Sequence, residues 1–181
     1  MEETRFEAPT TLFIRRWGEM AASWGIGRTM AEIHALLYLA TDPLCTDDLM
    51  ERLAVSRGSA SMNLRELVNW GLIHRVHQRG DRKEYFEAER DVWQMFETIV
   101  RERRRREVQP IVETIERCHI MIDEEKAPLR GQARKEAEAY KKRFTDILEF
   151  CEIMNTLFNL MTKAGHGGLR PIATALGRLA G

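Results

Sequence analysis

Apolar side chains recur at helical spacing in the first forty residues. Two stripes, each with spacings of three or four residues, are formed by Phe13, Trp17, Met20 and Trp24, and by Met30, Ile33, Leu37 and Ala40. Such spacing places each set on one face of a helix. The Trp24–Gly27 segment, with two glycines, separates the helices, and Pro43 ends the second one. The pattern predicts two amphipathic helices in sequence.

The next thirty residues predict two shorter helices joined by a tight turn. Thr46 is a good N-cap for a helix that ends at Leu53. Ser56 can cap a second helix that runs to Trp70, and Gly71 stands where a left-handed C-cap is favoured. The order helix, turn, helix is therefore expected.

Two short strands follow, over residues 72–77 and 84–88, around a polar, glycine-containing hairpin at 78–83. Asp91 then caps a helix that begins at Val92. A helix-turn-helix followed by a hairpin is a winged helix-turn-helix. The fold class expected is mainly α with a small two-stranded β-wing, extended by long N- and C-terminal dimerisation helices.

The second half of the chain predicts long helices. Pro110 should kink or break the first of them, because its ring removes a backbone hydrogen bond. A linker at 127–131 precedes a final helix at 132–163, whose heptad spacing is typical of helix pairing. The dimer interface predicted from both terminal helices comprises Phe13, Trp17, Tyr140, Phe144, Ile147, Cys151, Met154, Phe158 and Met161.

These elements suggest five segments. They are an N-terminal dimerisation helix (1–27), a winged helix-turn-helix for DNA binding (28–91), a linker helix kinked near Pro110 (92–126), a C-terminal dimerisation helix (132–163) and a flexible, glycine-rich tail (164–181).

The charge is balanced overall but not locally. The 181 residues include 28 basic and 28 acidic side chains, whereas the stretch from Ser56 to Lys83 holds six basic residues against two acidic ones. A basic helix surface with a basic wing suits phosphates and guanine edges. The candidate DNA-binding residues are Arg57, Ser59, Ser61, Met62, Arg65, Arg79, Arg82 and Lys83.

Three stretches resemble the GbsR-like branch of the MarR-type regulators. They are SRGSASMNLRELVNWGL at 56–72, GDRKEYFEAERDVW at 80–93 and RERRRRE at 101–107, within a resemblance that extends from about Trp17 to Pro110. The resemblance implies a dimeric bacterial or archaeal transcription factor, usually a repressor, that uses its terminal helices for dimerisation. That branch is associated with choline or glycine-betaine genes and osmoprotection, which implies a small-molecule effector.

Two further clusters have alternative interpretations. The arginines at 103–106 could contact DNA phosphates, or could form ion pairs with Glu102 and Glu107. Four aromatic residues could line a pocket for a quaternary ammonium ion through cation–π attraction, although aromatic residues at this spacing are more often core. That candidate effector pocket comprises Trp17, Trp24, Tyr38 and Trp93.

The remaining chemistry is sparse. The histidines and the cysteines Cys45, Cys118 and Cys151 show no metal-ligand spacing, so no metal or other cofactor is expected. No nucleophile motif or phosphate-binding loop indicates an enzyme. No segment is apolar enough for a membrane span or a secretory signal, so we expect a cytoplasmic protein. A winged-helix protein-interaction module is one alternative function. A thiol-based redox sensor, with Cys45 as the reactive loop thiol, is another.

Overall fold

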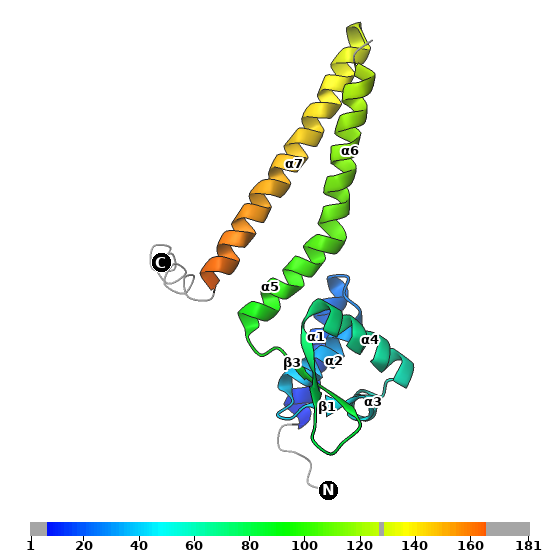
Figure 1. Cartoon of the computed structure of the whole chain (residues 1–181), viewed down its shortest axis with the longest axis vertical. Helices are drawn as coiled ribbons and strands as arrows, with labels where there is room; N and C mark the ends of the chain where they lie inside the picture. Colours follow the sequence, from blue (N-terminus) through cyan, green and yellow to red (C-terminus); the bar gives the residue numbers. More distant parts are fainter. Residues whose placement is uncertain (1–6, 127–128, 166–181) are drawn as a thin grey trace. The chain divides into compact units, whose positions relative to one another are not determined.

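The computed structural model describes residues 7–126 and 129–165, and it is mostly helical with one small sheet (Figure 1). The predicted flexible tail beyond residue 165 lies outside the described residues. The chain divides into two compact units, Met1–Ile99 and Val100–Gly181. The predicted N-terminal helix, the helix-turn-helix and the start of the linker helix thus belong to the same unit.

Helices α1 (Glu7–Ser23) and α2 (Arg28–Leu39) pack against each other at the start of the first unit. The buried face of α1 consists of Ile14, Gly18 and Ala21. A Cβ atom at Gly18 would lie 2.6 Å from Cγ of Glu32, so glycine permits the close approach of α2. The predicted stripe that includes Phe13 lies beside this face and is largely exposed, because the small residues make the contact.

Helices α3 (Thr46–Leu53) and α4 (Arg57–Trp70) form the predicted helix-turn-helix. Ser56 accepts a hydrogen bond from the backbone N–H of Ser59 at 3.2 Å, and Gly71 has a φ of 75°. Both predicted caps of α4 are therefore confirmed. The predicted N-cap of α3 is wrong by one residue. Cys45 is the cap, because the Asp48 carboxylate accepts its backbone N–H at 2.7 Å.

The sheet has three strands rather than the two predicted. β2 (Ile73–His77) and β3 (Glu84–Ala88) form the wing, and β1 (Leu44–Cys45) pairs with the other edge of β3, so the order is β1-β3-β2 with all pairs antiparallel. A strand of two residues is too short to show the alternating pattern on which strand prediction depends. The core of the unit joins these elements, and its most deeply buried side chains are Ile33, Leu37, Leu49, Leu67 and Ile73.

Helix α5 (Val92–Arg103) begins as predicted, because the Asp91 carboxylate accepts the N–H groups of Trp93 and Gln94 at 2.8 and 3.1 Å. A π-helical turn, η1 (Arg104–Val108), leads into α6 (Gln109–Lys126). The helix is therefore distorted one turn before Pro110 but not broken. The wider turn gives the proline ring room that a regular helix lacks.

Helix α7 (Gly131–Gly165) runs antiparallel to α6 in the second unit (Figure 1). Three contacts in reverse order establish this direction. Arg104 donates to Asn155, His119 Nε2 lies 3.1 Å from Thr145 Oγ1, and Lys141 pairs with Asp123. The two helices form an extended hairpin.

Candidate nucleic-acid interface

Helix α4 presents one apolar and one polar side. Ala60, Leu64 and Leu67 are buried against the rest of the unit, as their spacing predicts. The opposite side carries the predicted DNA-binding residues. Arg57, Met62 and Arg65 are exposed, Met62 by 61%, whereas Ser59 and Ser61 are half-buried. A short polar helix face is thus available to a groove.

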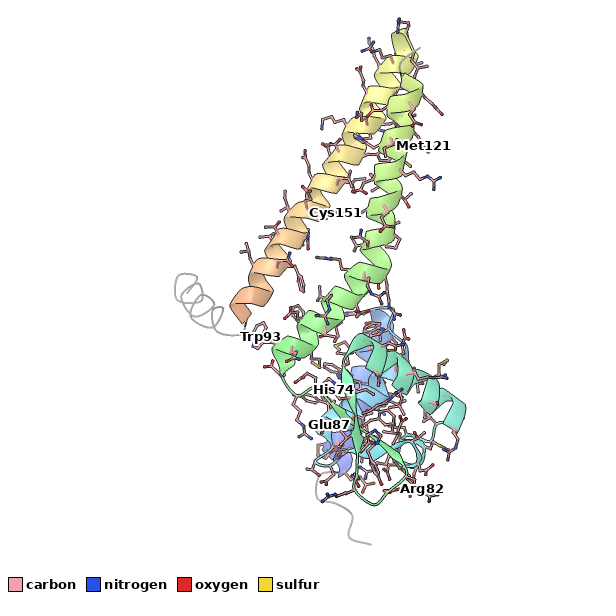
Figure 2. The ribbon with its side chains drawn as sticks, in the orientation of Figure 1. His74, Arg82, Glu87, Trp93, Met121 and Cys151 are labelled. Atoms are coloured by element: carbon pink, nitrogen blue, oxygen red, sulfur yellow. The ribbon has the colours of Figure 1, made fainter. Side chains whose placement is uncertain are left out.

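The wing presents further cations at the end of its hairpin, where Figure 2 labels Arg82. Arg79 and Arg82 are exposed, and Gly80 has the positive φ of 90° that the turn requires. Asp81 holds the tip together by accepting the Tyr85 hydroxyl at 2.7 Å and the Lys83 backbone N–H at 3.0 Å. The hydrogen bond from Tyr85 is the main cause that lowers the pKa of Asp81. The loop is thus shaped by internal bonds that leave two guanidinium groups in solvent.

Asp47 links the two basic elements, a role that its position in the sequence does not indicate. Its Oδ1 atom lies 2.5 Å from Nη2 of Arg57, and its Oδ2 atom lies 3.1 Å from Nζ of Lys83. Hydrogen bonds from Lys83 and Arg57 lower the pKa of Asp47, and Asp47 in turn raises the pKa of Lys83. The only sequence signal was an acidic residue in the first turn of α3, which the favourable interaction of a negative charge with a helix N-terminus already explains.

The arginines at 103–106 have partners within the second unit. Glu102 accepts Arg105 at 2.8 Å and lies 3.8 Å from Arg106, and Glu107 pairs with Arg103 at 3.0 Å. Arg104 donates to Asn155. The structure therefore favours ion pairing over phosphate contact for this run.

A second candidate site is an apolar cavity of about 230 Å³ in the first unit. Two of the four predicted aromatic residues, Trp17 and Tyr38, lie in its wall. Trp24 and Trp93 are not among its lining residues. Trp24 is 58% exposed in the turn after α1, and Trp93 is exposed beside the lining residues of α5. The complete lining is Phe13, Trp17, His34, Ala35, Tyr38, Val92 and Met95.

His34 is the polar group that distinguishes this cavity. It is 3% exposed, and its Nε2 atom has no hydrogen-bond partner among the described residues. Burial lowers the pKa of His34 to about 4, so the ring is uncharged near neutral pH. A buried polar atom without a partner is unfavourable and favours a ligand that supplies one. The sequence showed only a histidine within an apolar helix.

Helix α7 carries apolar side chains on two sides. Phe144, Cys151 and Phe158 are half-buried, and Cys151 (labelled in Figure 2) lines a cavity together with residues of α6. The second predicted heptad row is exposed at Tyr140, Ile147 and Met154, while the side chain of Met161 lies outside the described residues.

Four large exposed residues of α7 lie outside the predicted heptad rows. They are Phe150, Ile153, Leu157 and Leu160, with Phe150 62% exposed. Each is offset from the two heptad rows used for the prediction. In the N-terminal part of the predicted interface, Phe13 is exposed and stacks on Trp17 with ring centroids 5.5 Å apart.

The predicted loop position of Cys45, on which its assignment as a reactive thiol rested, is wrong. Cys45 is buried in β1, where it pairs with Tyr85 and caps α3, and burial of this kind disfavours reaction of the thiol with an oxidant in solvent. Among the described residues, no three His, Cys, Asp or Glu side chains are grouped to hold a metal ion. No helix in the described part of the chain is long and apolar enough to cross a membrane.

Comparison with known proteins supports a MarR-type winged helix. Residues 24–84 match the model of the MarR family. The chain is 28% identical over 87 residues to a putative HTH-type transcriptional regulator, YvaV, of Bacillus subtilis (48% of this chain, 49% of the relative). It is 29% identical over 115 residues to the HTH-type transcriptional repressor GbsR of the same organism (64% of this chain, 63% of the relative). The chain thus matches about half of the length of YvaV and less than two thirds of the length of GbsR.

A solved structure described as a transcriptional regulator shares the fold. It has a TM-score of 0.50 and 18% sequence identity, and the alignment covers 86% of this chain and 99% of that chain. At this identity the similarity shows the fold, a winged helix-turn-helix with long added helices.

Proposed function

We propose that this protein is a DNA-binding transcriptional repressor of the GbsR-like branch that acts as a homodimer. The observation that carries the proposal is the outer face of α4 beside the hairpin cations Arg79 and Arg82. A helix of this kind enters a major groove, while a basic wing contacts phosphates or the adjacent minor groove. Arg65 is the side chain we assign to a base edge.

The test begins with selection of bound sequences from random duplex DNA by the wild-type protein. In the selected duplex, Arg65→Ala should lose about 1–3 kcal/mol of binding free energy and relax the preference at one base position. Arg82→Ala should weaken binding to all sequences and reduce the salt dependence. Arg15→Ala is the matched control, because it removes the same charge from α1, outside the proposed DNA-binding surface.

The alternative of a protein-interaction module makes the opposite prediction. No sequence would be enriched, and neither arginine variant would differ from Arg15→Ala in DNA affinity. That result would end the proposal. Enrichment of an imperfect palindrome with half-site centres about one helical turn apart would support it, because a two-fold dimer presents two copies of α4.

The dimer proposal depends on the exposed side of α7. A monomer rarely leaves a contiguous row of large apolar side chains in water. A second copy of the same helix offers a surface of the same chemistry and of the same length. The face proposed for this contact comprises Tyr140, Ile147, Phe150, Ile153, Met154, Leu157 and Leu160.

We also propose that the cavity beside His34 holds the effector. The resemblance points to choline or glycine betaine, and the faces of Trp17 and Tyr38 can attract a quaternary ammonium ion. An uncharged His34 would not repel such a cation, and its Nε2 atom could bond to a polar group of the ligand.

Titration calorimetry with choline and with glycine betaine tests this site. Trp17→Ala should abolish binding and the release of DNA by the ligand. Trp93→Ala should retain both, because Trp93 does not line the cavity. If both variants bind the ligand equally well, the effector site is not this cavity.

A further inference from the structure

We propose that Asp47 is a positioning residue that fixes the wing relative to the first turn of α4 and so sets the preference for one DNA sequence over another. This inference rests on the DNA-binding function proposed above. It goes beyond that function by assigning specificity to an acidic residue within a basic surface.

The geometry suits a bridge between separate elements. Asp47 stands in the first turn of α3, Arg57 is the first residue of α4, and Lys83 directly precedes β3. The two carboxylate oxygens pair with different cations, Oδ1 with Arg57 and Oδ2 with Lys83, so the two ion pairs do not compete for one atom. A single side chain thus connects the helix-turn-helix to the hairpin.

The backbone at Asp47 is well anchored. The neighbouring Asp48 accepts the N–H of Cys45 at 2.7 Å, and Cys45 pairs with Tyr85 of β3. Leu49, two residues further along, is fully buried in the core. The carboxylate is therefore a fixed point to which two long, flexible cationic side chains are held.

The N-terminus of α3 favours an acidic residue at position 47, but this preference does not explain why the carboxylate is shared by two cations of the DNA-binding surface. Phosphates repel a negative charge, so an uncharged residue between Arg57 and Lys83 would favour binding to any DNA. Exposed ion pairs contribute little to stability, and the side chain of Asp47 is 48% exposed. Preorganisation of the Arg57 and Lys83 side chains in the free protein does explain this arrangement, because side chains that are already ordered lose less entropy when DNA binds.

The test compares Asp47→Asn and Asp47→Ala with Glu51→Gln. Glu51 is exposed one turn further along α3, so its substitution removes the same charge from the same helix without altering either ion pair. Binding is measured to the duplex selected by the wild-type protein and to a random duplex of equal length. All three variants should bind the random duplex more tightly. Only the Asp47 variants should lose preference for the selected duplex, by about threefold or more.

A cycle with Lys83 identifies the route. In a Lys83→Ala background, Asp47→Asn should change the preference less than it does in the wild type. Equal thermal unfolding of all variants shows that the fold is intact. An unchanged preference in both Asp47 variants, at a level equal to Glu51→Gln, would overturn this inference while leaving DNA binding in place. Failure of the wild-type protein to select any sequence would overturn both proposals.

Discussion

Among the residues that the structure describes, His34 has the pKa that the fold shifts furthest. Burial lowers its pKa from 6.5 to about 4. Between those values the unfolded chain binds a proton that the folded protein does not bind. The stability that this group confers is therefore complete above pH 6.5 and is lost as the pH falls towards 4, by up to about 3 kcal/mol.

Urea unfolding at pH 7.5 and pH 5.0 measures this loss. When the pH is lowered from 7.5 to 5.0, the free energy of unfolding should decrease more in the wild type than in His34→Gln, which cannot take up the proton. His74→Gln, at an exposed position, should retain the steep dependence. Parallel pH profiles for wild type and His34→Gln would show that other groups dominate.

Single residues could be predicted from the sequence where their partners are local. Ser56 and Asp91 were identified as caps because each accepts hydrogen bonds from residues within three positions. Asp47 could not be assigned, because Arg57 and Lys83 lie 10 and 36 positions away and only the fold brings them together. Cys45 was misjudged because the strand that buries it has two residues.

At the scale of elements, Gly71 ends α4 in a left-handed conformation. A Cβ atom there would meet nothing within 4 Å, so the cost of Gly71→Ala is the backbone strain alone. We expect a loss of about 1–2 kcal/mol in the free energy of unfolding. Gly58→Ala, in the first turn of the same helix and without a positive φ, should instead stabilise, by less than the about 1 kcal/mol of a helix interior.

Chemical denaturation of the two variants distinguishes these effects. If Gly71→Ala unfolds at the wild-type denaturant concentration, the C-cap does not limit the stability of α4. A loss in Gly58→Ala would instead indicate that the first turn of α4 tolerates no added methyl group.

Most element boundaries could be predicted because caps and apolar spacing act within a few residues. α4, β3 and the start of α5 lie where the sequence predicts them. The turn η1 was missed, since nothing in a run of arginines distinguishes a π turn from regular helix. Pro110 correctly predicted a distortion in this part of the helix. The distortion is a π turn and not a break, because the backbone hydrogen bonds of the preceding turn are rearranged.

At the scale of the whole molecule, the exposed side of α7 predicts the oligomeric state. Replacing Ile147 and Met154 together by glutamate places charges in the proposed contact, and a desolvated charge without a partner is costly. The variant should have the mass of a monomer in light scattering. Glu152→Lys, at an exposed position that is not three or four residues from any member of that face, should remain a dimer.

A double variant with the full dimer mass would place the contact on another surface. The heptad rows alone could not divide α7 correctly, because one row faces α6 of the same chain and the other faces solvent. Sequence spacing shows which residues share a side of a helix. It does not show which neighbour covers that side.

The exposed apolar side chains along α7 imply that the stability of the protein depends on its concentration. If pairing protects that helix, the folded form is favoured by mass action, and the midpoint of heat unfolding rises with protein concentration. A cell that holds few copies would then lose some of them through unfolding and proteolysis. The number of copies in the cell and the fraction that stays folded would then both depend on one row of side chains.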